Sequence, residues 1–291
     1  MRIVMDFDGV YTDPTEEGDA CSRGFRNKIA SLGLVALGLA TEEGVDSWLG
    51  ELRARQASQP FRFGWRSGGR VSAFTFEDPF IRNIGLADYL DHLADAGDLK
   101  AKKVLSGLSA REKIRSYGEL SEWSFHQLHL KKRPDPLAKK WVMDTMSRGH
   151  EVFIVSNSAT GKIQEFLDQA GFPKDQRPQV RGGARKFGLG NTPCPLKLGR
   201  WGGQEVEVDT DRPLYEQALL ELKPDAVIGD VFCLDLALPV RLKREKTLGV
   251  PGGIHYRHRD YTPSPMLDFV GGKNSEVPEV RVLRDWDQLR I

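Results

Sequence analysis

The sequence predicts an α/β fold, a Rossmann-like parallel sheet with a mostly α-helical domain inserted after its first strand. Two observations predict it. In residues 134–291, short apolar runs alternate with helical patterns, which is the order of elements in a parallel sheet with right-handed crossovers. Residues 14–133, by contrast, have mainly helical spacing. We therefore expect residues 1–13 and 134–291 to form the core and residues 14–133 to form the helical domain.

The first element is the apolar run Ile3–Met5, which predicts a short buried strand. Two carboxylates, Asp6 and Asp8, follow it directly, and Gly9 lies behind them. Ligands of open α/β sheets bind at the carboxyl ends of the strands. Acidic residues at that position therefore indicate a catalytic or metal-binding role more than a packing role. The alternative interpretation is a solvated turn after the first strand.

The helical domain is expected to contain a small hairpin or loop over Phe61–Phe76, where aromatic residues, glycines and arginines are mixed. Ser109 and Glu112 have the spacing of a capping box, which predicts the start of a helix that runs towards Leu130. Other helices are expected over 25–40, from Thr41 as N-cap to the proline at 60, and over 84–96.

In the second part of the core, Asp135, Pro136 and Gly149 frame a helix, with an N-cap, a first-turn proline and a C-terminal glycine in the expected places. A buried strand is expected directly after it, over Glu151–Val155. The remaining expected elements are a helix over 163–170, short strands over 179–183 and 205–208, a helix from Pro213, and strands over 226–228 and 280–283.

Composition limits the partners of the protein. The 42 Lys and Arg residues nearly cancel the 41 Asp and Glu residues, which argues against a broad electrostatic interaction with nucleic acid or with an anionic membrane. The three cysteines, Cys21, Cys194 and Cys233, are too few and too scattered for a disulfide framework, so we expect a cytoplasmic protein. The sequence does not indicate an oligomeric state.

Three predicted strands end in small polar or acidic residues, and the carboxyl ends of parallel strands meet at one edge of a sheet. Carboxylates that are forced together repel one another, and a bound hard cation is the usual way to keep them ionised. Oxygen ligands without a set of His or Cys residues indicate Mg²⁺ as the cofactor. The residues concerned are Asp6 and Asp8, Ser156 and Asn157, and Asp230 and Asp235.

A metal ion beside an ionised aspartate suits phosphoryl transfer, because the site must neutralise the phosphoryl oxygens. In this interpretation Asp6 attacks phosphorus and forms an aspartyl-phosphate. Asp8 protonates the leaving oxygen and later deprotonates the attacking water. Ser156 binds a phosphoryl oxygen with its neighbour Asn157, and Asp230 holds the metal with support from Asp235.

The motifs resemble those of the haloacid dehalogenase superfamily. Residues 6–13 are similar to its first motif, Asp-x-Asp-Gly-Val-x-x-Asp, Ser156 stands at the second motif, and 229–235 resemble the Gly-Asp-x-x-x-x-Asp form of the fourth. The resemblance implies that Mg²⁺ contacts the Asp6 carboxylate, the Asp8 main-chain carbonyl and the Asp230 carboxylate. It also implies that the helical domain is a cap of the C1 type, which acts as a lid and sets substrate choice.

The third motif of the superfamily supplies a cation, usually lysine, that steadies the nucleophile. Arg212 stands in the expected place, just ahead of the helix that precedes Asp230, and is the first choice. Lys186 is the alternative and Lys197 a weaker one. A solvated surface cation is the competing interpretation for each.

The second aspartate limits the possible reactions. The dehalogenases of the superfamily lack an acid at the position of Asp8, so the sequence argues against a dehalogenase. The expected function is a Mg²⁺-dependent phosphatase that acts on a small soluble phosphomonoester. A phosphomutase of the β-phosphoglucomutase type is the alternative, since those enzymes begin with the same motif. A catalytically silent binding module on the same fold is the third possibility.

Four residues of the helical domain are candidates for substrate specificity, because arginine and aromatic side chains suit a sugar, a nucleoside or a second anionic group. The competing interpretation is that the tryptophan packs within the domain and that the arginines are solvated. The four residues are Arg62, Trp65, Arg66 and Arg70.

Overall fold

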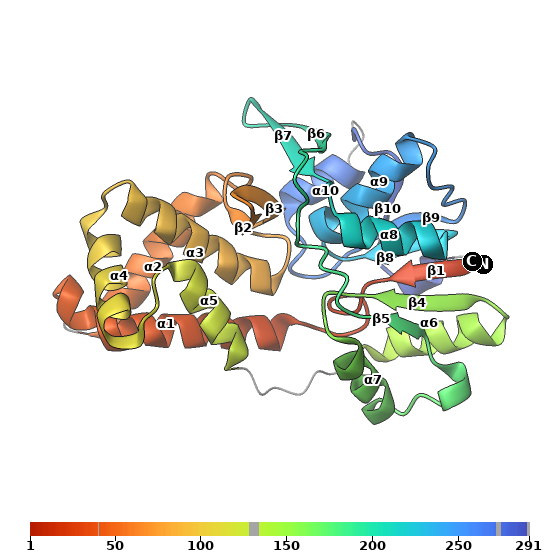
Figure 1. The fold of residues 1–291 in the computed structure, drawn as a ribbon, viewed down its shortest axis with the longest axis horizontal. Coiled ribbons are helices and arrows are strands. Elements are labelled where there is room, and N and C mark those ends of the chain that lie inside the picture. The colour runs from red at the N-terminus through yellow and green to blue at the C-terminus, as the bar shows by residue number, and fades with distance from the viewer. Residues whose placement is uncertain (40, 128–133, 272–274, 290–291) are drawn as a thin grey trace. The chain divides into compact units, whose positions relative to one another are not determined.

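The computed structural model describes residues 1–39, 41–127, 134–271 and 275–289 (Figure 1). The chain forms two compact units. Unit 1 contains Met1–Asp13, Arg66–Ala73 and Lys132–Ile291, and unit 2 contains Pro14–Trp65 and Phe74–Lys131. The segment Arg66–Ala73 therefore belongs to unit 1, although it lies inside the predicted helical domain. The expected boundary residue 133 lies outside the described residues.

Unit 1 is built on a six-stranded parallel sheet with the order β10-β9-β8-β1-β4-β5. The arrows of β1 and β4 point the same way in Figure 1, and every pairing in the sheet is parallel, so the carboxyl ends of the strands share one edge. The predicted α/β fold with a parallel sheet is confirmed. The strands are β1 (Arg2–Met5), β4 (Glu151–Val155), β5 (Gln179–Arg181), β8 (Ala226–Gly229), β9 (Gly253–Arg257) and β10 (Val280–Leu283).

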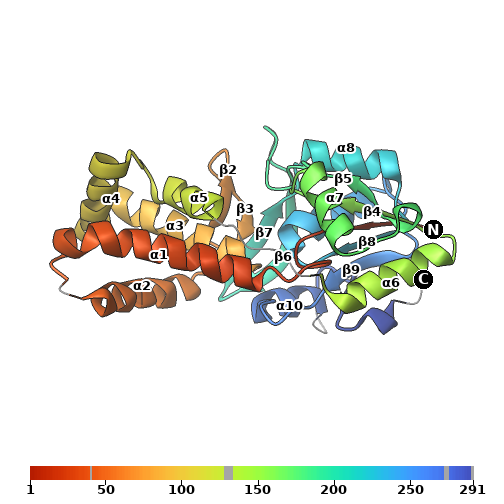
Figure 2. The ribbon, with the colours of Figure 1, turned by 90° about the horizontal axis from the view of Figure 1, so that it is seen from below.

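Helices cover both faces of this sheet, as α6 and α8 show on opposite sides of it in Figure 2. The helix α6 begins as expected, because the side chain of Asp135 accepts hydrogen bonds from the main-chain N–H groups of Leu137 and Ala138. The helices are α6 (Pro136–Ser147), α7 (Thr160–Gln169), α8 (Pro213–Leu222), α9 (Ala237–Arg244) and α10 (Ser264–Gly271), with short turns at Lys174–Gln176, Phe232–Leu236 and Trp286–Gln288.

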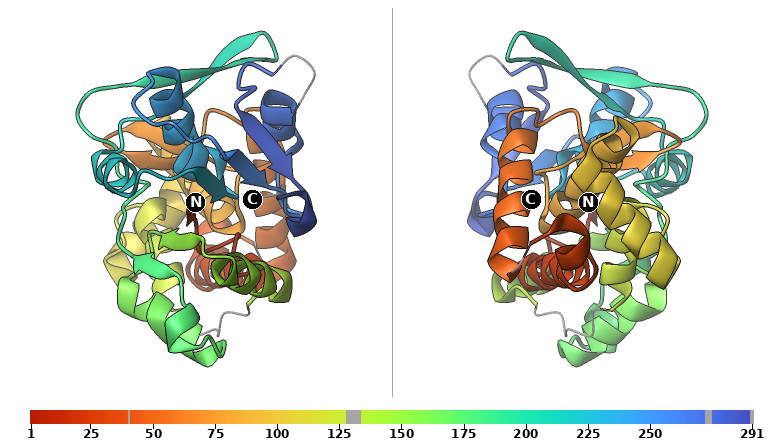
Figure 3. Two further views of the ribbon diagram at one scale, coloured as in Figure 1. Left: turned by 90° about the vertical axis from the view of Figure 1, so that its right-hand side faces the viewer. Right: turned by 90° about the vertical axis from the view of Figure 1, so that its left-hand side faces the viewer.

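A separate antiparallel hairpin extends from unit 1 (Figure 3). It consists of β6 (Pro195–Trp201) and β7 (Gln204–Asp209), joined through Gly202 and Gly203, both with positive φ. The sequence predicted β7 but neither β6 nor β9. Glycine and basic residues hide the strand pattern in β6.

Unit 2 is mainly helical, with a core formed by residues such as Phe25, Leu49, Leu86 and Leu108. Thr41 precedes α2 as expected, whereas the first helix begins well before the predicted residue 25. Among the described residues, no helix combines the length and apolar character needed to cross a bilayer. The elements are α1 (Thr15–Leu37), α2 (Glu42–Ala57), β2 (Gly64–Ser67), β3 (Arg70–Phe74), α3 (Pro79–Asp95), α4 (Leu99–Glu112) and α5 (Tyr117–His126), and the tip of the β2–β3 hairpin belongs to unit 1.

The predicted helix from Ser109 to Leu130 is wrong. Helix α4 ends at Glu112, because Lys113 adopts a left-handed conformation with φ 59°. Helix α5 then starts after Ser116, whose hydroxyl accepts a hydrogen bond from the N–H of Glu119 at 3.0 Å. Ser116 and Glu119 have the same spacing as the pair at 109 and 112. The capping-box pattern therefore does mark a helix start, but it occurs twice in the sequence and the helix begins after the second occurrence. Leu130 lies outside the described residues.

Candidate active site

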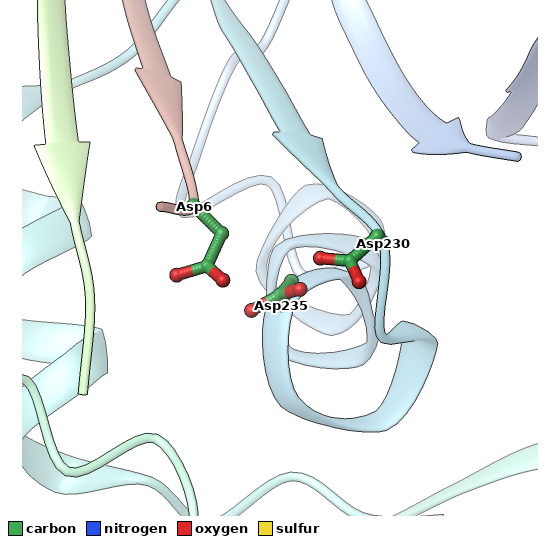
Figure 4. Close-up of side chains that lie close together, drawn as sticks. All are labelled: Asp6, Asp230 and Asp235. Carbon is green, nitrogen blue, oxygen red and sulfur yellow. The ribbon is translucent and has the colours of Figure 1, made fainter. Parts of the chain in front are cut away.

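Three aspartates gather at the carboxyl edge of the sheet (Figure 4). Asp6 follows β1 and Asp230 follows β8, and these strands are hydrogen-bonded neighbours, with the Asp6 N–H donating to the carbonyl of Ile228 at 3.0 Å. Asp235 lies one turn further on, in the short helix after β8. One carboxylate oxygen of each aspartate lies within 4.8 Å of the others. Residues distant in the sequence thus form one acidic cluster.

A lysine ammonium group is buried against this cluster. Lys186 Nζ donates to Asp6 Oδ1 at 2.7 Å and to Asp235 Oδ1 at 2.9 Å, and its side chain is 1% exposed. It also lies over the ring of Tyr215, 5.1 Å from the centroid. Lys186 was the alternative choice for the cation beside Asp6.

The first choice, Arg212, is corrected by the structure. Its guanidinium donates to the carbonyl of Lys186, to the carbonyl and hydroxyl of Ser72 at 2.7 and 2.8 Å, and to the carbonyl of Asp209 at 3.2 Å. Within the described part of the chain, the only cation on the Asp6 carboxylate is Lys186. The planar five-donor fork of arginine suits several separated carbonyls, whereas an ammonium suits two facing carboxylates.

The two buried charges set each other's protonation. The pKa of Asp6 is raised to about 7. Burial is the largest cause, the facing Lys186 lowers the pKa by less than burial raises it, and the carboxylates of Asp235 and Asp8 contribute to the rise. Burial alone would lower the pKa of Lys186, but Asp235 and Asp6 together raise it above its ordinary value. The lysine therefore stays charged, while Asp6 needs more positive charge nearby to be fully ionised at neutral pH.

The loop after β5 places Lys186. Its main-chain N–H donates to Asn157 Oδ1 at 2.6 Å, and the N–H of Ala184 donates to the carbonyl of Ser156 at 2.9 Å. Gly182 has no room for a side chain, because a Cβ would overlap the main chain around Thr160. Asn157, predicted to bind phosphate, thus accepts a hydrogen bond that fixes the lysine loop.

The tip of the β2–β3 hairpin also contacts this loop, within unit 1. The hydroxyl of Ser67 accepts from the N–H of Leu189 at 3.0 Å, and the hydroxyl of Ser72 donates to the carbonyl of Phe187 at 2.8 Å. Arg70 donates to Asp209 and to the carbonyl of Gly190. No sequence pattern indicated that this hairpin contacts the core.

These contacts bear on the four specificity candidates. The guanidinium of Arg70 is engaged by Asp209 and by the carbonyl of Gly190, and its role in substrate specificity stays a prediction. Arg66 donates to the carbonyl of Gly69 within the same hairpin at 2.9 Å. Arg62 donates to Gln59 at 2.7 Å in unit 2, and Trp65 is partly buried there. The roles of Arg62, Trp65 and Arg66 stay predictions.

Asp8 is held by two hydroxyl groups. Thr12 donates to Asp8 Oδ1 at 3.3 Å, and Ser158 donates to Asp8 Oδ2 at 3.1 Å. Ser156 is buried at the end of β4, where its hydroxyl accepts from the N–H of Ser158 at 3.2 Å. Ser158 was missed at the sequence level, although it belongs to the polar run that ends this strand.

Sequence reasoning also missed two residues of the loop after β9. Tyr261 donates from its hydroxyl to Asp230 Oδ2 at 2.6 Å. Arg259 donates to the carbonyls of Gly9 and Val10 and to Asp135. No motif marks this loop, so only the folded chain reveals it.

The residues present fit a hard divalent cation. The donor set is made of carboxylates, which Mg²⁺ prefers, and Asp6 and Asp230 come from adjacent strand ends. Gly9, with φ +78°, has no side chain because a Cβ there would overlap the carboxylate of Asp230. Asp235 is already hydrogen-bonded to Lys186 and to the N–H of Val231 at 3.0 Å, so it suits a supporting position.

No family model and no curated protein matches the sequence. Among solved structures, a haloacid dehalogenase-like family hydrolase from Xanthomonas campestris shares 11% identity, with 98% of this chain and 91% of that chain covered and a TM-score of 0.44. A CbbY variant from Rhodobacter sphaeroides in complex with xylulose-(1,5)bisphosphate shares 11% identity over 99% and 96%, with a TM-score of 0.42. A 2-haloacid dehalogenase from Pseudomonas syringae shares 14% over 99% and 95%, with a TM-score of 0.38. At these values the likenesses do not establish a family.

Proposed function

We propose that the protein is a Mg²⁺-dependent phosphatase that hydrolyses a small phosphomonoester through an aspartyl-phosphate on Asp6. The observation that carries the proposal is the cluster of Asp6, Asp230 and Asp235 with the buried ammonium of Lys186 against it. Carboxylates and a lysine at one strand edge are the elements that phosphoryl transfer needs, namely a nucleophile and positive charge for the phosphoryl oxygens. The motif resemblance points to the same chemistry.

Asp6 is the nucleophile in this proposal. Only its ionised form attacks phosphorus, and burial holds its pKa at about 7 even with Lys186 alongside. Bound Mg²⁺, held by Asp6 and Asp230 with Asp235 in support, would supply the extra positive charge that ionises Asp6 and neutralises the phosphoryl oxygens. Lys186 keeps one oxygen of Asp6 fixed by its hydrogen bond, so the attacking group is oriented before substrate arrives.

Asp8 acts as the general acid and base. The hydroxyls of Thr12 and Ser158 hold its two oxygens at 3.3 and 3.1 Å, which restrains the carboxyl group near the strand end. Asp8 would donate a proton to the leaving oxygen and would then take one from the water that cleaves the aspartyl-phosphate. Ser156, at the end of β4, would donate to a phosphoryl oxygen.

Unit 2 is the lid in this proposal. A lid excludes water from the reaction and contacts the leaving group, so it sets substrate choice. Arg62 and Trp65, in unit 2, and Arg66, at the hairpin tip, are the side chains that we assign to this task.

The test is hydrolysis of an aryl phosphate with and without Mg²⁺ by the full chain and by Asp6→Asn. Removing the nucleophile should lower kcat by about a thousandfold or more, because no second group in the cluster replaces it. Asp144→Asn is the control, since Asp144 lies on α6 and pairs only at the surface with Lys140. Equal turnover by Asp6→Asn and the unaltered chain would remove Asp6 from its role.

The same assay separates the alternatives. A phosphomutase, favoured by the shared first motif, would isomerise a sugar phosphate in the presence of a bisphosphate primer without net release of phosphate. A silent binding module would bind phosphate esters without turnover. Steady release of inorganic phosphate supports the phosphatase.

A further inference from the structure

The loop after β9 brings a phenol to the acidic cluster. Tyr261 Oη donates to Asp230 Oδ2 at 2.6 Å, a short hydrogen bond to a carboxylate that is 1% exposed. Hydrogen bonds to a charged acceptor are shorter and stronger than neutral ones. The contact therefore restrains the rotation of the Asp230 carboxylate.

The turn that carries Tyr261 is closed on itself. The N–H of Arg259 donates to the hydroxyl of Thr262 at 2.8 Å, and the N–H of Thr262 donates to the carbonyl of Arg259 at 2.9 Å. Because both bonds flank Tyr261, the main chain on either side of the phenol is fixed.

The same turn is attached to the loop that follows β1. The guanidinium of Arg259 donates to the carbonyl of Gly9, to the carbonyls of Val10 and Thr12 at 3.2 and 3.4 Å, and to Asp135 Oδ2 at 3.0 Å. One side chain thus connects the Tyr261 turn to the loop after β1 and to Asp135, the N-cap of α6.

There is no room for a side chain at Gly9, between the two loops. A Cβ at Gly9 would lie 2.5 Å from Tyr261 Oη and would overlap the carboxylate of Asp230. The phenol, the glycine and the carboxylate are therefore fitted to one another, and the hydroxyl has little freedom to leave Asp230.

We infer that Tyr261 is a positioning residue for the divalent cation, and that it acts through Asp230. This inference rests on the proposed Mg²⁺-dependent function. A carboxylate that is held in its binding orientation before the cation arrives loses less freedom on binding, so affinity rises. Groups that orient a metal ligand in this way typically contribute 10–100-fold to metal affinity.

The test is Tyr261→Phe in the full chain, with Mg²⁺ affinity measured by calorimetric titration without substrate. We expect Mg²⁺ binding about 10–100-fold weaker than in the unaltered chain, and kcat restored at saturating Mg²⁺. The matched control is Tyr117→Phe, which removes a buried phenol bond to the carbonyl of Ala101 at 2.8 Å in unit 2. The control should leave Mg²⁺ affinity unchanged. A merely structural role would lower the melting temperature of the metal-free protein and leave the affinity of the folded fraction unaltered.

A second variant, Thr262→Val, keeps the phenol but removes the hydroxyl that closes the turn, and should weaken Mg²⁺ binding less than Tyr261→Phe. Thr262→Val is the test variant if Tyr261→Phe does not fold. Unchanged Mg²⁺ affinity in the folded variants, with binding intact in the unaltered chain, would overturn the role of Tyr261 and leave the proposed function standing. Absence of Mg²⁺ binding by the unaltered chain would overturn both.

Discussion

The loop that carries Lys186 and the turn that carries Arg212 place two buried cations close together in unit 1, yet the partners of these cations differ in kind. Lys186 contacts two carboxylates, whereas Arg212 donates, among the described residues, to three main-chain carbonyls and a hydroxyl. Arg212 also donates to the carbonyl of Lys186 itself. Burial alone therefore does not distinguish the two cations. Their acceptors do, because Lys186 contacts the acidic cluster and Arg212 contacts main-chain carbonyls, which is why the proposed function uses Lys186.

Of the substitutions that distinguish the roles of the two cations, Lys186→Met is expected to have the largest effect. It removes the charge beside Asp6, which raises the pKa of Asp6 further and leaves the transferred phosphoryl group without that cation. We expect kcat for an aryl phosphate to fall about a thousandfold, measured at saturating Mg²⁺.

Lys197→Met is the matched control for that experiment. The Lys197 ammonium pairs with Glu205 at 2.6 Å on the β6–β7 hairpin, and its side chain is 61% exposed. We expect it to keep full activity. A kcat for Lys186→Met within tenfold of the unaltered chain would contradict the assignment of this lysine.

Arg212→Met is expected to have a smaller effect, and to lower stability rather than turnover. The substitution leaves the carbonyls of Lys186, Ser72 and Asp209 buried without their donor, so the free energy of unfolding should fall by about 3 kcal/mol. Urea denaturation followed by circular dichroism measures it.

Arg212→Lys keeps the charge but not the fork, and should recover only part of that stability. The assignment of a structural role to Arg212 would be contradicted if Arg212→Met had the same free energy of unfolding as the unaltered chain and its kcat fell as far as that of Lys186→Met.

The smallest effect is expected from Arg70→Met. Its pair with Asp209 is partly exposed, so the loss of stability should be only about 0.5–1 kcal/mol. Because the guanidinium is engaged by Asp209 and Gly190, the KM for substrate should not change. A rise in KM of tenfold with unchanged stability would place Arg70 among the substrate-contacting residues.

The acidic cluster could be predicted from the sequence, because strands that end in Asp6 and Asp230 must meet at one edge of a parallel sheet. The choice between Lys186 and Arg212 could not, since it depends on how two loops fold back over that edge. Tyr261 and Arg259 lie outside every motif, and their contacts arise only when the loop after β9 meets the one after β1. Local signals were sufficient for helix starts such as Asp135 but did not choose between Ser109 and Ser116, which share the same pattern.

The hairpin tip, Arg66–Ala73, limits how freely the helical part of the chain can be exchanged. Ser72 supplies two of the acceptors of Arg212, and Arg212 in turn holds the carbonyl of Lys186. A chain shortened by joining residue 13 to residue 134 would strip a fully buried guanidinium of those acceptors, and the charged group would then face an empty space. A chimaera that places another helical domain on this sheet must therefore keep these eight residues, so the part of the chain that supports the acidic cluster extends beyond the strand ends.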